Sequence, residues 1–499
     1  SAASDVYKRQ CVDRAISRVG KELVLMAPLG LGKPVQLVNA FYHRAASDPS
    51  ISLHIYTALC LERPPAGSGV EASLADPIMH RLFGDYEELA FIKPVREDRL
   101  PANIQVSELY FKAGSMKGVA SAQRNYISSN YTHIARDMFD AGANVLVQLV
   151  AARETADGLS VSLSCNPDTA LELGQMFDDS DRSYISIGQI HPDLPYMKND
   201  AEIGVGVMDL LVSNPDYDKT LFAVPNSAVP LKDYATALHA STLVADGGTL
   251  QIGIGALGDA VAYSCILRQE HNSAYCQAVE SLTHQHAAVA GHRESFDKGL
   301  YVSTELFVNG MMQLIEHGVV KRKVYDNLAL QTGLNNGAIS SAIDERLFEY
   351  CRAQGVIPIH LGERDLETLT YWGILNSVTL ASADTLSVAG ESVPNNMDDP
   401  QTRSAVLGAA KGAVLRNGRI LHGGFFLGPA DFYQKLRELD ALGQEHICMT
   451  GVQRTNQLLL DYPLYCAQRQ QARFINTGMM VTLTGAVASD ALEDGTVIS

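Results

Sequence analysis

The hydrophobic positions in the first half of the chain form short, dense runs that alternate with helical patterns. Residues 22–27 (ELVLMA) and 51–59 (ISLHIYTAL) are apolar runs, and residues 35–45 between them (VQLVNAFYHRA) have helical spacing. Residues 143–151 (ANVLVQLVA) show the continuous apolarity of a strand that is buried on both faces. These patterns predict a βαβ opening and one parallel or mixed sheet within residues 11–235.

The second half repeats this rhythm after the Pro-containing segment 224–230. A helix is predicted over residues 234–244, a strand over 248–254 and a second helix over 259–267. The rhythm resumes at residues 423–439, 445–451 and 473–487, while residues 325–416 are predicted to be an insertion. The sequence therefore predicts an α/β protein with two open-sheet domains, residues 11–235 and 236–499.

Three further expectations concern local structure. A helical pattern runs over residues 125–139, and the first ten residues show no periodicity, so no element is predicted there. We expect residues 479–483 to lie within the C-terminal sheet. The chain ends at Ser499 in a strand-like run with no cap, which is typical of a fragment.

The central stretch of the second half is residues 299–320, GLYVSTELFVNGMMQLIEHGVV. Residues 300–303 predict the end of a strand, and a helix is predicted from Asn309 to a stop at Gly318. Glu305 lies between the two. A carboxylate at the C-terminal end of a strand stands where open α/β sheets bind ligands, although a solvated loop glutamate has the same pattern.

Composition limits the kinds of partner. With 46% hydrophobic and 19% charged residues the chain is globular, and its net charge of −17 argues against nucleic-acid or membrane-surface binding. No apolar run approaches the ~18 residues of a membrane span. The eight cysteines form no CxxC pair, which favours a reducing compartment, and we expect a cytoplasmic protein with small-molecule partners.

A polar segment before the central stretch is rich in histidine. His271, His284, His286 and His292 have no carboxylate or cysteine partners at zinc-site spacing. We therefore expect a solvated insertion there and no metal.

A glycine-rich loop follows the strand predicted over residues 248–254. IGIGALG, residues 252–258, matches GxGxxG at Gly253, Gly255 and Gly258 and opens a helix, whose N-terminus favours a phosphate or an oxyanion. A dinucleotide site needs an acidic residue at the end of a second strand about 20 positions later. Glu280 has that spacing, but no strand is evident around it, so a dinucleotide site is disfavoured.

Several of these stretches together resemble one family. GKPVQLVNAF, AQRNYI, DGGTLQIGIGALGDAV, STELFVNGMMQLIEHGVV, GGFFLG and FINTGMMVTLTGAV are similar to the acetyl-CoA hydrolase/transferase family, which includes acetate- and 4-hydroxybutyrate-type CoA-transferases. The resemblance implies two domains of the NagB/RpiA/CoA-transferase-like type. It also implies a homo-oligomer that uses coenzyme A as a substrate and has no tightly bound cofactor.

The resemblance also implies roles for particular residues. Glu305 matches the family's nucleophile, and Gly253, Ile254, Gly255, Ala256 and Leu257 match its CoA-binding loop. Asn476 matches an asparagine that contacts CoA. A further Gly-rich loop of the family is expected to follow Ser499.

The chemistry suits a carboxylate nucleophile. Such a group forms an acyl anhydride that CoA thiolate reopens, which leaves a glutamyl-CoA thioester. A carboxylate that attacks this thioester completes CoA transfer, and water that attacks it gives acyl-CoA hydrolysis. A CoA-transferase acting on small carboxylates is thus the first hypothesis and an acyl-CoA hydrolase the second. An NAD-dependent oxidoreductase and a non-catalytic CoA-binding scaffold remain as alternatives.

Overall fold

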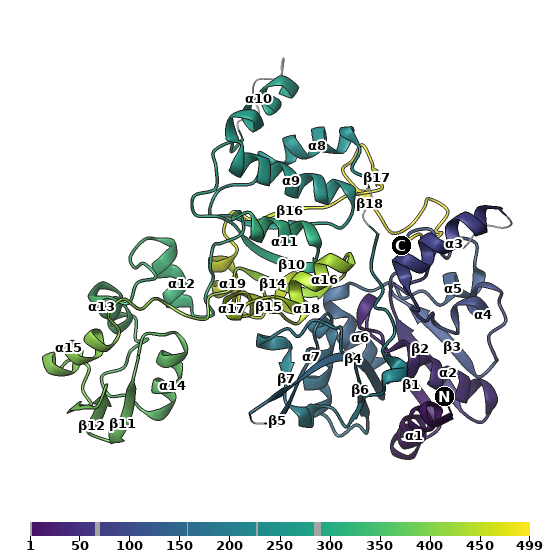
Figure 1. Ribbon diagram of the computed structural model, residues 1–499, viewed down its shortest axis with the longest axis horizontal. Coiled ribbons are helices and arrows are strands. Elements are labelled where there is room, and N and C mark those ends of the chain that lie inside the picture. Colours follow the sequence, from purple (N-terminus) through teal and green to yellow (C-terminus); the bar gives the residue numbers. More distant parts are fainter. Residues whose placement is uncertain (1, 65–69, 157, 226–227, 284–290) are drawn as a thin grey trace.

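The structure, a computed structural model, describes residues 2–64, 70–156, 158–225, 228–283 and 291–499. Figure 1 shows two α/β units and a smaller lobe that projects from the second of them. Each unit is built on its own open sheet, and the described strands form no barrel. The predicted fold class, α/β with two open sheets, is confirmed.

The N-terminal unit has a mixed sheet of eight strands. Six strands are parallel and follow the order β3-β2-β1-β4-β6-β8. Their bounds are β1 Glu22–Met26, β2 Ser52–Thr57, β3 Ile104–Glu108, β4 Val145–Thr155, β6 Ile185–Ile190 and β8 Leu210–Val212. Two further strands are antiparallel, β5 Gly158–Ser162 and β7 Glu202–Ile203. Strand β5 pairs with β4, and β7 pairs with β5. As predicted, β4 is nearly all buried along its first half because it lies inside the sheet.

Helices and short 3₁₀ turns connect these strands. They are α1 Ala2–Val19, η1 Gly30–Gly32, α2 Val35–Ser47, α3 Val70–Phe83, α4 Ile92–Arg96, α5 Ala120–Arg124, η2 Tyr131–His133, α6 Ile134–Asp140, α7 Pro167–Asp178, η3 Asn199–Ala201, η4 Val205–Val207 and η5 Pro215–Tyr217.

Two of the local expectations in this unit are wrong. Helix α1 includes residues 2–10, and it buries Cys11, Val12 and Ala15 in the core that also holds α2. The helix predicted over residues 125–139 is reduced to α6. The Asn130 side chain accepts a hydrogen bond from the Thr132 amide at 2.9 Å and so starts a separate turn, η2, ahead of α6.

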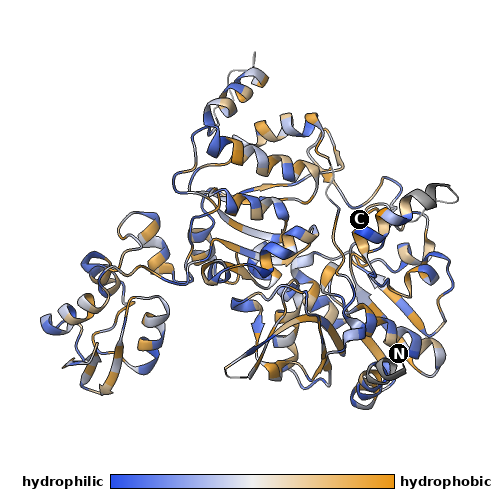
Figure 2. Cartoon of the chain, in the orientation of Figure 1, coloured by the Kyte–Doolittle hydropathy of each residue, from blue (hydrophilic) through white to orange (hydrophobic). Residues whose placement is uncertain are grey.

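The C-terminal unit has a fully parallel sheet with the order β15-β14-β10-β9-β16. The strands are β9 Thr249–Ile252, β10 Tyr301–Phe307, β14 Leu421–Phe426, β15 Ile447–Met449 and β16 Arg473–Ile475. The helices around this sheet are α8 Leu231–Ser241, α9 Ala256–Glu270, α10 Asn272–Thr283, α11 Asn309–Glu316, α16 Ala430–Arg437, α17 Ala441–His446, α18 Val452–Asn456 and α19 Tyr462–Gln468. Figure 2 shows hydrophobic residues along the strands of both sheets, as expected for strands covered by helices.

Two expectations about strands in this unit are corrected. Strand β10 continues to Phe307, so Glu305 lies within the strand and not after its end at Ser303. The strand extends because it is paired with β14 as far as Phe307 and Phe426. Residues 479–483 do not join the sheet. β17 Met480–Val481 pairs with β18 Val487–Ala488 as an exposed hairpin after β16.

The lobe has a hydrophobic core of its own, made of residues between Tyr325 and Leu415 and including Phe348, Trp372 and Leu386. Its elements are α12 Leu328–Asn335, α13 Glu345–Ala353, α14 Glu363–Tyr371, β11 Val378–Ser382, β12 Thr385–Val388, β13 Glu391–Pro394 and α15 Pro400–Ala409. The three strands form an antiparallel meander. The lobe begins and ends at one place, where Val324 and Arg419 exchange backbone hydrogen bonds of 2.8 Å.

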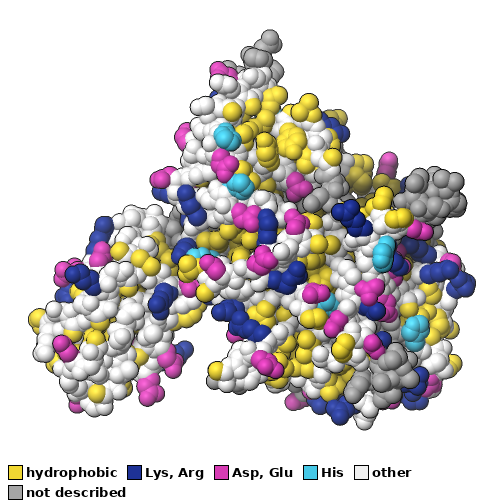
Figure 3. Space-filling view, viewed as in Figure 1, with side chains coloured by type: hydrophobic (Ala, Val, Ile, Leu, Met, Phe, Trp, Pro, Cys, Tyr) yellow, Lys and Arg dark blue, Asp and Glu magenta, His cyan; other side chains and the backbone are white. Residues whose placement is uncertain are grey.

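The surface is of mixed charge. Figure 3 shows Lys and Arg side chains interspersed with Asp and Glu over the face it presents. Among the described residues no helix is long and apolar enough to cross a membrane. No group of three or more His, Cys, Asp or Glu side chains in the described chain is placed to hold a metal ion. His284 and His286 lie outside the described residues.

Candidate active site

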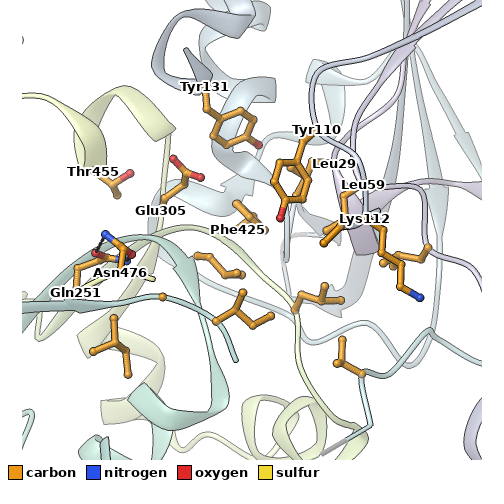
Figure 4. A pocket seen from close by; sticks show the side chains of 18 of the residues that line it. Leu29, Leu59, Tyr110, Lys112, Tyr131, Gln251, Glu305, Phe425, Thr455 and Asn476 are labelled. Atoms are coloured by element: carbon orange, nitrogen blue, oxygen red, sulfur yellow. Dashed lines mark hydrogen bonds between the residues drawn. The ribbon is translucent and has the colours of Figure 1, made fainter. Parts of the chain in front are cut away.

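Glu305 projects into a cavity of about 910 Å³ between the two α/β units. The N-terminal unit contributes Leu29, Leu59, Tyr110, Lys112 and Tyr131 to its walls, and the C-terminal unit contributes Gln251, Phe425, Thr455 and Asn476 (Figure 4). The volume is in the range of small-molecule and cofactor sites. A carboxylate is thus presented by a central strand to a cleft between two sheets.

Two glycines of GGFFLG allow β14 to approach the backbone of Glu305. A Cβ atom on Gly424 would lie 2.8 Å from the Glu305 carbonyl oxygen, and one on Gly423 would lie 3.2 Å from the Met449 sulfur. Real Cβ atoms do not come as close as 2.8 Å to backbone oxygen. The glycine pair therefore holds the segment that carries the carboxylate close against its neighbouring strand.

The carboxylate of Glu305 has one described hydrogen-bond donor. Asn456, the last residue of α18, donates from Nδ2 to Glu305 Oε2 at 2.6 Å. Burial raises the pKa of Glu305, and the hydrogen bond from Asn456 opposes that rise. No Lys, Arg or His of the described chain forms an ion pair with Glu305. The amide of Asn456 is therefore the group that favours the ionised form of Glu305.

Helix α18 is itself anchored by charged groups. Arg454 forms an ion pair with Asp326, which also accepts a hydrogen bond from Gln468 Nε2 at 2.8 Å. Burial raises the pKa of Asp326, but the positive charge of Arg454 stabilises the carboxylate. The pKa of Asp326 is therefore held below its ordinary value. This network fixes the turn of chain that brings Asn456 to Glu305.

The glycine-rich loop reaches the same cavity from β9. Gly253 donates its amide to the Ile475 carbonyl at 3.0 Å, and a Cβ atom there would be 3.1 Å from Asn476 Oδ1. Asn476 and Gln251 pair through both amide groups, at 3.0 and 3.1 Å. Gly253, Ile254 and Asn476 thus line the cavity together with Glu305.

The rest of the predicted loop forms the start of α9. Gly255 is the residue before the helix and has φ 110, which favours glycine. Ala256 and Leu257 are the first residues of α9, and none of these three is among the residues that line the cavity. A Cβ atom on Gly258 would lie 2.0 Å from the Gly253 carbonyl oxygen, so glycine is required for the helix to pack on its own loop.

The N-terminal unit places a buried acid behind the cavity wall. The hydroxyl of Tyr131 donates to Asp168 Oδ2, which also accepts from Asn166 Nδ2 at 3.2 Å. Burial raises the pKa of Asp168 to about 6 although these hydrogen bonds lower it, and the charge of Glu305 adds to the rise. Asp168 Oδ1 is buried and has no hydrogen-bond partner among the described residues.

The sequence did not single out Asn456, Tyr131 or Asp168. Asn456 follows Glu305 by 151 positions and lies in no motif. Asp168 occurs in an Asn-Pro-Asp sequence that indicates only a helix start. Lys112 is the cation that lines the cavity, whereas Lys117 and Arg124, which follow it along the chain, are exposed outside it.

Comparison with known proteins gives likeness in structure alone. No protein-family model matches the chain, and no curated protein matches it either. RipA from Yersinia pestis superposes with a TM-score of 0.50 at 16% identity, over 97% of this chain and 75% of that one. A glutamate-to-alanine mutant of RipA gives 0.53 at 17% identity, over 96% and 74% of the two chains.

One further solved structure is a 4-hydroxybutyrate CoA-transferase from Porphyromonas gingivalis. It aligns at 13% identity over 96% of this chain and 74% of that one, with a TM-score of 0.46, and we draw no argument from that alignment. The likeness to RipA shows that this chain shares the fold of RipA. At such identities no catalytic residue or substrate is transferred from one chain to the other.

Proposed function

We propose that the chain is a CoA-transferase that moves CoA between an acyl-CoA and a small carboxylate through a glutamyl-CoA thioester on Glu305. The observation that carries this proposal is the meeting of Glu305, Gly253 and Asn476 in one cavity between two α/β units. The sequence resemblance to acetyl-CoA hydrolase/transferases assigned the nucleophile and the CoA contacts to these same residues.

The proposed reaction has two exchanges. A carboxylate oxygen of Glu305 attacks the thioester carbonyl, the C–S bond breaks, and CoA leaves as the thiolate while an anhydride forms. The thiolate then attacks the glutamyl carbonyl of the anhydride, so the original acyl group departs as a free carboxylate. An incoming carboxylate reverses these steps on the glutamyl-CoA thioester and leaves as a new acyl-CoA.

Three features of the site favour this chemistry. Asn456 supports the anionic form of Glu305 before attack. The glycine loop and Asn476 offer the pantetheine end of CoA a backbone that it can approach closely. The apolar walls of the cavity reduce the access of water to the glutamyl-CoA thioester, which water would hydrolyse.

The hydrolase alternative uses the same nucleophile. Glu305 is not fully buried, so water has a route to the thioester. For the oxidoreductase alternative, Glu280 lies in helix α10 and not at the end of a strand, which leaves the ribose-binding requirement unmet at that position.

The replacement Glu305→Gln tests the proposal. It keeps the shape of the side chain but removes the nucleophile, and we expect exchange between acyl-CoA and labelled carboxylate to fall by at least about a thousandfold. Hydroxylamine or borohydride should trap a CoA-dependent adduct at Glu305 in the parent chain only. Glu391→Gln, at an exposed position of the lobe, is the matched control and should exchange normally. Unchanged exchange by Glu305→Gln, with deamidation excluded by mass, would refute the mechanism.

A further inference from the structure

The cavity has an apolar wall that begins beside Glu305 and continues into the N-terminal unit. Leu29 and Phe425 are buried in one small cluster across the two units, and Leu59 and Leu306 pack against it. Leu59 also packs against the large core cluster that contains Leu61, Phe83 and Phe222, three further residues that line the cavity. Figure 4 shows Phe425, Leu29 and Leu59 in sequence from Glu305 toward Lys112. The wall is therefore continuous.

Leu59 is held in a backbone conformation that bulky residues rarely adopt. Its φ is 42, in the left-handed region. Its amide donates to the Tyr110 carbonyl at 2.8 Å, and its own carbonyl accepts a hydrogen bond from Lys33 Nζ at 3.2 Å. Lys33 is buried beneath this turn and also donates to the Ala58 carbonyl. Strained residues that their surroundings fix in this way cluster at ligand sites.

The charges around the cavity argue against a second carboxylate on the acyl group. The charged side chains among the described lining residues are Glu62, Lys112 and Glu305. Glu62 is paired with Arg96 at 2.7 Å, and Lys112 is exposed and lies beyond Leu59, at the end of the wall away from Glu305 (Figure 4). A carboxylate buried against that wall would lose its hydration and find no cation there.

We infer that the acyl group handled at Glu305 is an apolar monocarboxylic one larger than acetyl, aliphatic or aromatic, with its body against Leu29, Leu59 and Phe425. This inference rests on the proposed function, because it places the acyl carbonyl at Glu305. The acyl chain extends from there over Phe425 toward Leu59. A dicarboxylic acyl group as short as succinyl would put its second carboxylate against Leu29 and Phe425, which offer it no countercharge, and acetyl leaves the wall uncovered.

Binding to a chain that cannot turn over provides the test. On the Glu305→Gln background, calorimetry would compare CoA, acetyl-CoA, hexanoyl-CoA, benzoyl-CoA and succinyl-CoA. Each buried methylene adds roughly fourfold to affinity at most. We expect hexanoyl-CoA and benzoyl-CoA to bind at least about tenfold more tightly than acetyl-CoA, and succinyl-CoA to bind no more tightly than acetyl-CoA.

A second substitution assigns the gain to the wall. Asparagine tolerates the left-handed region, so Leu59→Asn removes the apolar side chain and keeps the turn. It should abolish most of the preference for hexanoyl-CoA while leaving the affinity for CoA itself within about twofold. Leu328→Asn, at a 43% exposed leucine in the lobe, is the matched control and should keep the preference.

The outcomes separate the two proposals. Equal affinities for acetyl-CoA and hexanoyl-CoA, or tightest binding of succinyl-CoA, would overturn the acyl assignment and leave the CoA-transferase proposal standing. A hexanoyl preference that survives Leu59→Asn would overturn the assignment to this wall. Failure of every CoA compound to bind would overturn the proposed function and, with it, this inference.

Discussion

At the scale of single residues, the site joins one carboxylate to one amide. Glu305 is a partly buried carboxylate without a cationic partner among the described residues, and Asn456 is its hydrogen-bond donor. A hydrogen bond to a charged group contributes about 1.5–3 kcal/mol. The balance between burial and this hydrogen bond decides how much of Glu305 is ionised at a given pH.

Removal of that amide should be visible in a pH profile. Asn456→Ala leaves burial to raise the pKa of Glu305 further, so the acid limb of kcat/KM should move to higher pH. On the acid limb we expect a loss of about tenfold or more, which shrinks as the pH rises and Glu305 ionises. Asn336→Ala, in the lobe, is the comparison variant. A parallel loss at every pH would mean that Asn456 acts on something other than ionisation.

The buried carboxyl group of Asp168 should make the free energy of unfolding depend on pH. Burial raises its pKa from an ordinary 3.8 to about 6, so the folded chain binds the proton more tightly than the unfolded chain. The stabilisation is therefore fully present below about pH 4 and is lost as the pH rises through about 6. The loss amounts to roughly 3 kcal/mol by the linkage relation.

Asp168→Asn should remove this dependence. The neutral amide keeps an oxygen that accepts from Tyr131 and carries no buried charge. Urea unfolding at pH 4.5 and 7.5 should then give a smaller difference in unfolding free energy than in the parent chain, by roughly 2 kcal/mol, because at pH 4.5 part of the stabilisation is already lost. Asp384→Asn, on the surface of the lobe, should leave the parent difference unchanged. If Asp168→Asn also leaves it unchanged, Asp168 is ionised throughout this range in the folded chain.

Some residues of the site could be predicted from the sequence, and others could not. Glu305, Gly253 and Asn476 carry motif signals and meet in the cavity. Tyr131 was hidden because a helical pattern extended across it, and only the cap at Asn130 breaks that pattern. The contact of Asn456 with Glu305 could not be predicted, because a hydrogen bond between residues 151 positions apart leaves no local pattern in the sequence.

At the scale of elements, the alternation of apolar runs predicted the sheets because buried parallel strands have a strong sequence signal. The ends of the strands were predicted less accurately. Strand β10 extends beyond its apolar run because β14 pairs with it at Thr304 and Leu306. Residues 480–481 have an apolar pattern, yet they leave the sheet after β16 and pair with 487–488. Pairing partners, which the sequence does not name, decide both cases.

The packing of α9 on its loop gives an element-scale prediction. In Gly258→Ala the new methyl group would meet the Gly253 carbonyl oxygen at 2.0 Å, so the helix must shift away from the loop that lines the cavity. We expect destabilisation of about 1–3 kcal/mol and weaker CoA binding by calorimetry. Gly174→Ala, within α7, has no atom within 4 Å of the added methyl and should be neutral or stabilising. Tight CoA binding by Gly258→Ala would show that the loop tolerates the shift.

At the scale of the whole molecule, two α/β units enclose the cavity and a lobe stands apart from it. No described residue between 325 and 416 lines the cavity. The lobe has its own core, and it joins the sheet where Val324 and Arg419 are paired. It touches the rest of the chain through α12 and α19, where Asn335 Nδ2 donates to the Ala467 carbonyl at 2.8 Å.

Excision of the lobe should therefore spare ligand binding. Replacing residues 328–416 with a short Gly/Ser linker keeps Asp326, whose ion pair with Arg454 anchors the helix that carries Asn456. The paired strand ends at Val324 and Arg419 are already adjacent, so the linker closes a small loop at little entropic cost. We expect hexanoyl-CoA affinity on the Glu305→Gln background to stay within about twofold, because the buried contact area is unchanged. The melting temperature should fall as the contact between α12 and α19 is lost. Loss of binding in a variant whose far-ultraviolet circular dichroism and cooperative melting are preserved would show that the lobe shapes the site.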